Sequence, residues 1–303
     1  MKTANSIAYI DRRTGERKRD PIYKHDLLDW LYNNATGWFL TRFILSRKIV
    51  SQFYAWLNKR RSSARKIPGF IEAMNVRMVE SLRTAEDFDN FNDFITRKID
   101  MSQRPVGSDP DVCVAPADGR ILAFPVLDDA TCFTLKHCSF NLRTLLRDEG
   151  LARRYTNGTL VISRLYLADY HHFHFPDDGV AHKPLPIPGR YYATTPYSRR
   201  WVVPFFAENR RVLTLFDSEH FGRIAMIEVG AFTIGSIKQC FRPGDWVVRG
   251  EHKGFFELGG SVVTLLFENG TIALDPDLCD NTRAGLETFV RVGESIGRTP
   301  RHT

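Results

Sequence analysis

The sequence has no apolar run long enough to cross a bilayer. Its longest uncharged stretch near the N-terminus, residues 30–41, has 12 residues, whereas a membrane-spanning helix needs roughly 20. The chain opens with acidic and basic residues in mixture, and no apolar segment follows them. This pattern does not fit a signal peptide. We therefore expect neither a membrane-spanning helix nor a secretory leader.

Cysteine is scarce and follows no metal or redox spacing. An odd number without Cys-x-x-Cys pairs favours buried or incidental thiols in a reducing compartment over a disulfide framework. No His-Glu-x-x-His pattern and no acidic cluster accompanies the histidines, so no metal site is expected. The five cysteines are Cys113, Cys132, Cys138, Cys240 and Cys279.

Nucleic-acid-binding motifs are missing too, although the chain is basic. A formal net charge of +7 and a pI near 9.2 favour an anionic partner. The sequence shows no arginine-rich recognition helix, zinc finger or RNP-like strand pair, so we do not expect nucleic acid to be that partner. Lipid headgroups are the other anionic surface to consider.

Residues 24–66 have helical periodicity and an unusual composition. Apolar residues, many of them aromatic, recur at spacings near three and four, and the polar residues between them are mostly basic. Segments of this kind lie in the headgroup layer of anionic membranes. Helices packed on a catalytic core with a solvated basic side would show the same pattern. The periodicity alone does not decide between the two.

After Pro105 the pattern changes to strands. Turn residues at 268–270 predict a hairpin within the apolar run 261–274. The sequence thus predicts an α+β protein, with amphipathic N-terminal helices in a membrane-associating region 1–104 and a β-rich, barrel- or sandwich-like catalytic core in 105–303. The β-branched or apolar runs cover residues 159–167, 190–196, 211–216, 223–237, 246–249 and 261–274.

Three short motifs point to chemistry. In Gly259-Gly260-Ser261 the glycines tolerate a strained turn, and the serine hydroxyl is within reach of the Gly260 carbonyl. Pro116-Ala117-Asp118-Gly119 places an aspartate at a turn between two strands. The segment 169–176 holds His171, His172 and His174, and on an extended chain the last two share one face. Taken singly, each motif is also typical of plain structure: a bulge, an Asp-Gly turn and a half-buried aromatic strand.

Together these motifs resemble phosphatidylserine decarboxylase, a pyruvoyl-dependent enzyme family made as self-processing proenzymes. The resemblance runs over most of the chain, with several independent motifs in the family's order. They are Tyr9–Arg12, Phe91–Lys98, Arg104-Pro105, Pro116–Gly119, Asp169–His174, Asn209–Arg211, Val229–Ala231, Ile234–Ile237 and Gly259–Ser261.

The resemblance implies a processing triad of Asp118, His174 and Ser261. Asp118 would orient His174, which would take the hydroxyl proton of Ser261. The alkoxide would attack the Gly260 carbonyl, and an ester followed by β-elimination would cut the chain between Gly260 and Ser261. A large chain, 1–260, and a small chain, 261–303, would result. The small chain would begin with a covalent pyruvoyl group (pyruvate) derived from Ser261.

The resemblance also implies the reaction and its setting. The pyruvoyl group would form a Schiff base with the amine of phosphatidylserine and accept the electrons released with CO2, giving phosphatidylethanolamine. His171 is the candidate for returning the proton. The expected partners are phosphatidylserine in anionic membranes and the two processed chains, and a homodimer stays open. We expect a peripheral enzyme at the cytoplasmic face of the cell membrane.

Two alternatives stay open. One is a pyruvoyl-dependent decarboxylase of a free amino acid, against which the basic aromatic N-terminal helices argue. The other is a catalytically inert lipid-binding relative, against which the intact Asp118, His174 and Ser261 argue. One position also departs from the family, because His172 stands where arginine is common. If that arginine holds an anionic substrate group, His172 can do so only when protonated, and headgroup affinity should fall as pH rises.

Overall fold

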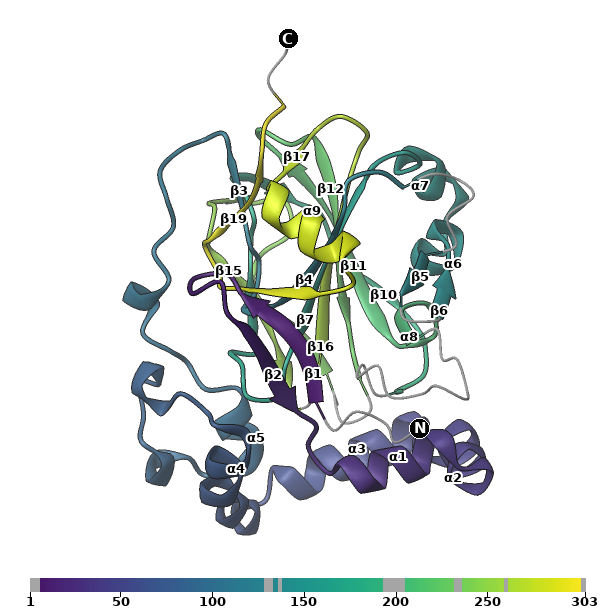
Figure 1. Ribbon diagram of the computed structural model, residues 1–303, viewed down its shortest axis with the longest axis vertical. Helices are drawn as coiled ribbons and strands as arrows, with labels where there is room; N and C mark the ends of the chain where they lie inside the picture. Colours follow the sequence, from purple (N-terminus) through teal and green to yellow (C-terminus); the bar gives the residue numbers. More distant parts are fainter. Residues whose placement is uncertain are drawn as a thin grey trace.

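The computed structural model describes residues 6–127, 133–135, 138–192, 205–231, 236–258 and 261–300. Gly259 and Gly260 of the expected cleavage site therefore lie outside the described residues, as do Cys132 and residues 193–204. The element that organises the described part is a large open sheet of mostly antiparallel strands, with one parallel pair, β1 beside β18 (Figure 1).

Eleven described strands form this sheet, in the order β14-β9-β11-β12-β16-β7-β4-β18-β1-β2, with β10 beside β11. They are β1 (Ser6–Asp11), β2 (Arg17–Pro21), β4 (Gly119–Phe124), β7 (Thr159–Leu165), β9 (Gly179–Ala181), β10 (Leu185–Ile187), β11 (Arg211–Ser218), β12 (Arg223–Val229), β14 (Trp246–Val247), β16 (Ser261–Phe267) and β18 (Glu287–Val290). Their central members are apolar and β-branched, which suits strands buried on both faces.

Smaller sheets pack around the large one. One runs in the order β13 (Ser236–Gln239), β15 (His252–Glu257), β8 (His172–His174). A second contains β17 (Ala273–Leu274), β19 (Ser295–Arg298) and β3 (Val112–Val114), and a third pairs β5 (Phe133–Leu135) with β6 (Cys138–Phe140). Leu165 and Val263 of the large sheet pack against Phe173 of β8 and Phe256 of β15. The described sheets do not close into a barrel. The predicted α+β core is therefore a sandwich.

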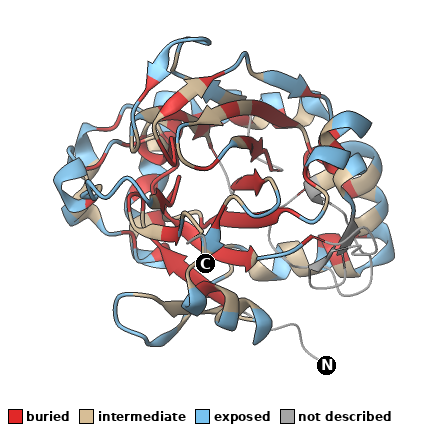
Figure 2. Cartoon of the chain, turned by 90° about the horizontal axis from the view of Figure 1, so that it is seen from above, coloured by how far each residue is buried: buried red, intermediate tan, exposed pale blue. Residues whose placement is uncertain are grey.

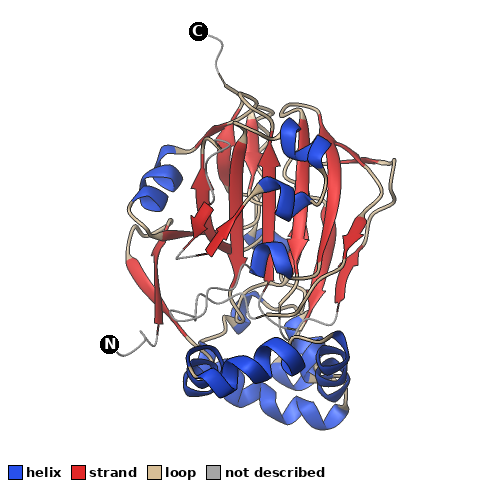
Figure 3. Ribbon diagram, turned by 90° about the vertical axis from the view of Figure 1, so that its right-hand side faces the viewer, coloured by secondary structure: helices blue, strands red, loops and turns tan. Residues whose placement is uncertain are grey.

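Helices gather at one end of the sheets, where they form a layer (Figure 3). The layer begins with α1 (His25–Asn33), α2 (Ala35–Leu40), the π-helical turn η1 (Thr41–Leu45) and α3 (Lys48–Asn58). It continues through η2 (Arg61–Lys66), α4 (Ile67–Met74) and α5 (Phe91–Ile95). This confirms the helical periodicity of residues 24–66. No helix of the described chain combines the length and the apolar character needed to cross a membrane.

The other helices are short, and they pack beside the sheets or lie in loops (Figure 1). They are η3 (Met78–Glu80), η4 (Ala85–Asp87), η5 (Met101–Gln103), α6 (Leu142–Leu146), α7 (Glu149–Arg154), α8 (Phe205–Glu208) and α9 (Pro276–Arg283).

The core lies between the large sheet and the layers on it, where most strand residues are buried (Figure 2). It also contains charge. Lys253 of β15 places its Nζ 3.0 Å from Oε1 of Glu228 on β12, and both side chains are completely buried. A buried pair of this kind is stable only when its remaining hydrogen bonds are made. Nζ also donates to Thr214 and Gln239, so this pair ties the small sheet to the large one.

Several strand predictions need correction. The first described residues, from Ser6 on, belong to the large sheet, because β1 and β2 form a hairpin and β1 pairs with β18. The hairpin predicted at 268–270 is wrong, since β17 pairs with β19 and not with β16. Residue Arg190 makes only an isolated bridge, to Asn209. The run 223–237 holds two strands in different sheets, β12 and β13, and residues 232–235 lie outside the described part.

Candidate active site

Asp118 is held in the turn that leads into β4. The residue is 2% exposed, and its carboxylate accepts hydrogen bonds from Arg104 Nη2 at 2.6 Å and from the Val292 N–H at 2.9 Å. Burial alone would lower the pKa of Arg104, but the bonds and charges of Asp118 and Glu80 outweigh it and raise that pKa. Asp118 is therefore the anionic half of a buried ion pair, fixed from two sides.

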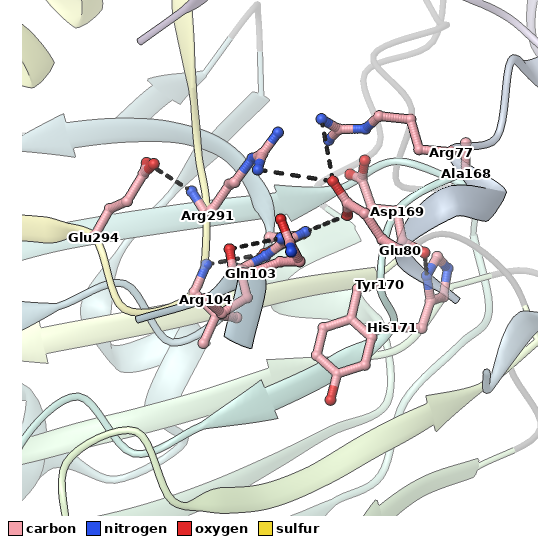
Figure 4. A network of polar contacts seen from close by, with 12 residues as sticks. Arg77, Glu80, Gln103, Arg104, Ala168, Asp169, Tyr170, His171, Arg291 and Glu294 are labelled. Carbon is pink, nitrogen blue, oxygen red and sulfur yellow. Dashed lines mark hydrogen bonds and ion pairs between the residues drawn. The ribbon is translucent and has the colours of Figure 1, made fainter. Parts of the chain in front are cut away.

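A network of charges continues outward from Arg104. Its guanidinium also donates to Glu80 at 2.7 Å. Glu80 lies between three arginines, since Arg77 and Arg291 approach its other oxygen at 3.5 and 3.7 Å (Figure 4). One carboxylate shared by three guanidiniums keeps Arg104 in one orientation, and with it the carboxylate of Asp118.

His174 ends β8 and lies close to the Asp118 turn, because its N–H donates to the carbonyl of Pro116 at 2.7 Å. Its Nδ1 is 2.9 Å from the carbonyl oxygen of Gly250. A carbonyl can only accept, so Nδ1 carries the proton in the neutral ring and Nε2 is the basic nitrogen. Burial lowers the pKa of His174 to about 4, against the opposing effects of the Gly250 carbonyl and the Asp118 charge. At neutral pH this imidazole is an uncharged base.

The hydroxyl of Tyr170 contacts that basic nitrogen, with 3.3 Å between the oxygen and Nε2 of His174. Burial, and then the charge of Asp118, raise the pKa of Tyr170 well above its ordinary value. The hydroxyl therefore stays protonated and donates a hydrogen bond to Nε2 of His174.

Asp118 and His174 do not contact each other directly, as the expected triad would require. Asp118 is hydrogen-bonded to Arg104 and Val292. The His174 ring is hydrogen-bonded to Gly250 and Tyr170.

His171 precedes β8 and is completely buried. Its Nδ1 lies 3.1 Å from the carbonyl oxygen of Asp169, which again assigns the ring proton to Nδ1. Arg97 binds the same segment, donating from Nη2 to the Asp169 carbonyl at 3.3 Å and to that of Ala168. The carbonyl of His171 accepts from the Phe256 N–H at 2.9 Å. His171 is thus held against β15, the strand that leads to the cleavage segment.

Ser261 begins β16, in register with Leu165 of β7. It is completely buried, and its Oγ has no hydrogen-bond partner among the described residues. Successive side chains of a strand alternate between faces, so Ser261 shares a face with Val263, which packs against Phe173 and Phe256. The hydroxyl therefore faces the small sheet of β8 and β15. Side chains also alternate along β8, so His174 lies on the face opposite Phe173, and the described residues show no hydrogen bond between His174 and Ser261.

The residue three positions before Ser261 has a strained backbone. Leu258 has a φ of 45°, in the left-handed region that costs a side chain with a Cβ about 1 to 2 kcal/mol. It is held there by packing, since its buried side chain belongs to a cluster with Phe70 of α4, Phe91 of α5 and Tyr166. The backbone is therefore strained at Leu258, two residues before Gly260 of the expected cleavage site.

His172 does not have the role predicted for it. Its Nε2 donates to the carbonyl of Thr96 at 3.0 Å, and its Nδ1 accepts from His252 at 2.8 Å. Burial is the main reason that its pKa is lowered to about 3. The ring is neutral near physiological pH and both nitrogens are engaged. The predicted pH-dependent binding of an anion by His172 is therefore wrong in this range.

The sequence missed two of these residues. Tyr170 was counted only as one of the aromatic neighbours of the histidines, and Arg104 only as part of an Arg-Pro pair. The order of motifs could have drawn attention to Arg104. Nothing in the sequence marks the contact of Tyr170 with His174, because residues four apart in a strand do not usually touch.

Comparisons with known proteins identify the family of this chain. A family model for phosphatidylserine decarboxylase matches residues 91–298. The phosphatidylserine decarboxylase proenzyme of Chlamydia felis is 38% identical over 293 residues, covering 97% of this chain and 98% of that protein. The proenzymes of Chlamydia muridarum and Clostridium beijerinckii are 38% and 35% identical, over 97% and 96% of this chain and 98% of each relative.

These similarities show that this chain is an enzyme, a decarboxylase of the proenzyme type. More particularly, it belongs to the phosphatidylserine decarboxylase family.

Proposed function

We propose that this chain cuts itself between Gly260 and Ser261 and then decarboxylates phosphatidylserine to phosphatidylethanolamine at a membrane surface. One observation carries the proposal. A buried serine hydroxyl without a partner among the described residues faces a sheet whose His174 is an uncharged base at neutral pH. Buried hydroxyls are normally hydrogen-bonded, and an exception calls for a functional explanation.

The self-cleavage uses only this chain's residues and water. Nε2 of His174 takes the Ser261 proton, and Oγ attacks the Gly260 carbonyl carbon. The imidazolium returns its proton to the nitrogen of Ser261 as the C–N bond breaks, which frees the Ser261 amine and leaves an ester. Loss of the Ser261 Cα proton then expels the Gly260 carboxylate and gives dehydroalanine. Its imine tautomer is hydrolysed by water to ammonia and a pyruvoyl group at position 261.

Asp118 acts in this scheme as a fixed negative charge. Burial lowers the pKa of His174, and the nearby charge of Asp118 opposes that effect, so Asp118 stabilises the imidazolium that forms when His174 accepts the proton. The strained φ of Leu258 adds to the driving force, because cutting the chain after Gly260 lets the backbone between Leu258 and the cut relax.

Position 261 fits the pyruvoyl group, since its side-chain oxygen is buried and takes no hydrogen bond from the described residues. When present, that group supplies an electron sink for the carbanion left by CO2. His171 is hydrogen-bonded to Phe256 of β15, and its ring proton is assigned to Nδ1. We assign it the return of a proton to the substrate α-carbon.

Membrane attachment is assigned to the helical layer. Helices α1–α3 expose large apolar side chains that a soluble surface rarely gathers in one place. With the intervening arginines and lysines they suit the headgroup layer of an anionic membrane, and hence a peripheral enzyme at the cytoplasmic face. These side chains are Leu27, Trp30, Phe39, Phe43, Ile44, Ile49, Phe53, Trp56 and Leu57.

Mass spectrometry of the purified chain under denaturing conditions tests the self-cleavage. The wild type should give chains 1–260 and 261–303, the latter blocked by pyruvate, while Ser261→Ala and His174→Ala should stay whole. A folded wild type that remains a single chain would exclude the proposal. His171→Ala should be cut normally but lose decarboxylation, and full turnover in this variant would remove its assigned role.

Vesicle sedimentation tests the membrane part. Phe53→Ser/Trp56→Ser removes two exposed aromatic rings from α3, each worth about 2 kcal/mol if buried in lipid, and should weaken binding to phosphatidylserine vesicles at least tenfold. Trp246→Ser is the matched control, because Trp246 of β14 is 57% exposed but lies on the large sheet. Equal loss in both variants would mean that α3 is not the attachment surface.

A further inference from the structure

A cavity of about 280 Å³ lies between the helical layer and the cleavage segment. Tyr54 of α3, Phe70 of α4 and Phe91 of α5 form an aromatic wall, and Lys24 and Lys66 contribute the charges. Among the residues that the structure describes, no acidic one lines this cavity. It is therefore an apolar chamber with two cations, which differs from the charge-balanced cluster around Arg104.

The two lysines lack a counter-ion. Nζ of Lys66 donates to the neutral Asn58 at 2.9 Å, and Nζ of Lys24 lies 5.7 Å from the ring centre of Tyr23. Neither forms an ion pair with any acidic residue of the described chain. Burial, followed by the charges of Lys24 and Arg65, lowers the pKa of Lys66. Two cations that repel each other at one cavity would be stabilised by an anion between them.

Two residues that line the cavity connect it to Ser261, one along the chain and one across the sheet. Leu258, which lines it, precedes Ser261 by three residues. Leu167, which also lines it, follows Leu165 by two residues, and Leu165 is the partner of Ser261 across the β7–β16 pair. This end of the cavity is thus separated from the first residue of β16 by at most three residues of chain, about 10 Å when extended.

The other end of the cavity meets the exposed apolar surface. Lys24 immediately precedes α1, and Tyr54 lies on α3 next to Phe53, which is 59% exposed. A molecule that extends from this surface to Ser261 therefore passes the two lysines. Its apolar part would stay at the helical layer, and its anionic part would come between Lys24 and Lys66.

We propose that this cavity binds the phosphate of a serine phospholipid headgroup, with Lys24 and Lys66 holding the phosphate oxygens and the amine directed toward position 261. The inference rests on the proposed function and adds the residues that recognise the substrate. Tyr54, Phe70 and Phe91 contact the glycerol end, and the acyl chains remain in the membrane. Free phosphate shares the same chemistry and is separated from the lipid by the experiment.

Steady-state kinetics on mixed micelles, with the surface fraction of phosphatidylserine varied, test the site. Lys24→Gln/Lys66→Gln should raise the interfacial KM about tenfold and change kcat less than twofold, and its mass spectrum should show normal self-cleavage. Lys66→Arg keeps the charge and should stay near wild type. Arg47→Gln/Lys48→Gln is the matched control, since it removes two cations from the same layer outside the cavity.

The control should weaken vesicle binding as much as the cavity variant while its interfacial KM stays within twofold of wild type. If both double variants raise the interfacial KM equally, the lysines act only by general attraction and the proposal is wrong. Uncut wild-type chain would instead contradict the proposed function, so the two failures can be told apart.

Competition by soluble anions shows whether the cavity binds a lipid headgroup or free phosphate. Glycerophosphoserine should inhibit the wild type at least tenfold better than inorganic phosphate, and this advantage should disappear in Lys24→Gln/Lys66→Gln. Equal inhibition by both anions would assign the cavity to free phosphate and overturn the headgroup assignment.

Discussion

At the scale of single residues, the hydrogen bond from Tyr170 to His174 is the contact with the clearest consequence. The Tyr170 hydroxyl donates to Nε2 of His174, the nitrogen that must accept the Ser261 proton. Tyr170→Phe removes the donor and keeps the ring that stacks on His172. Because this hydrogen bond occupies the lone pair that must take the Ser261 proton, we expect self-cleavage to become up to about tenfold faster, in line with the modest worth of one neutral hydrogen bond. The uncut fraction is followed by gel electrophoresis after synthesis.

His174→Ala serves as the comparison, because it removes the base and should stop cleavage altogether. A Tyr170→Phe chain that is cut as fast as wild type would show that the hydroxyl only fills space. A chain that is not cut at all would place Tyr170 among the essential residues.

The buried histidines also predict how stability depends on pH. The pKa values of His172 and His174 are about 3 and about 4 in the folded chain, below the ordinary value of about 6.5. Between those values the unfolded chain binds protons that the native chain does not, so the free energy of unfolding falls as pH is lowered from about 6.5 toward 4. Above pH 7 this contribution is constant.

Each histidine contributes at most about 1.4 kcal/mol per pH unit. Urea unfolding of the uncut Ser261→Ala chain at pH 7.5, 6 and 5 measures the slope, which should become shallower in His172→Gln/His174→Gln. His182→Gln changes an exposed histidine and should keep the slope. An unchanged slope without the two buried histidines would contradict this account.

At the residue scale, the sequence suggests candidate site residues only where they stand in a motif. Asp118, His174 and Ser261 could be selected because each stands in a recognisable motif. Tyr170 and Arg104 could not, since their importance comes from contacts that only the folded chain creates. For His172 the residue type left the charge open, and burial in the folded chain decides it by keeping the ring neutral.

At the scale of elements, the segment joining β15 to β16 carries the strain of Leu258. Substituting glycine removes the left-handed penalty, whereas alanine retains it, and both remove the packing of the leucine side chain. If the strain accelerates cleavage, Leu258→Gly should be cut up to about tenfold more slowly than Leu258→Ala, which corresponds to about 1.4 kcal/mol. Rates would be measured on chains synthesised in vitro.

Comparing two variants of one residue separates strain from packing. Equal rates in the glycine and alanine chains would show that the strained φ does not contribute. A faster glycine chain would mean that flexibility, and not strain, limits the reaction.

Elements were predicted well where a local pattern specifies them and poorly where distant partners do. The helices between residues 24 and 66 follow from their own periodicity. The pairing of β1 with β18 could not be read from either segment, because nearly the whole chain separates them. The false hairpin at 268–270 has the same cause: the turn is local, but the partner of β17 is β19.

At the scale of the whole molecule, the position of β16 decides what self-cleavage would leave behind. β16 lies between β12 and β7, and β18 lies between β4 and β1. Residues 261–303 thus contribute two interior strands to a sheet whose other described strands come from residues 1–260. Their apolar side chains, such as Val262 and Leu266, are completely buried in the common core.

We therefore expect the two processed chains to stay together after the peptide bond is cut. Removing β16 would expose two rows of unpaired backbone groups and a row of buried side chains, each worth about 1.5 to 3 kcal/mol. Native mass spectrometry and gel filtration should find a single complex of both chains, and the small chain should appear alone only in denaturant. A small chain lost under native conditions would mean that the sheet opens after cleavage. Position 261 would then lack the β7 and β12 neighbours that hold it against β8, and decarboxylation should be lost along with the small chain.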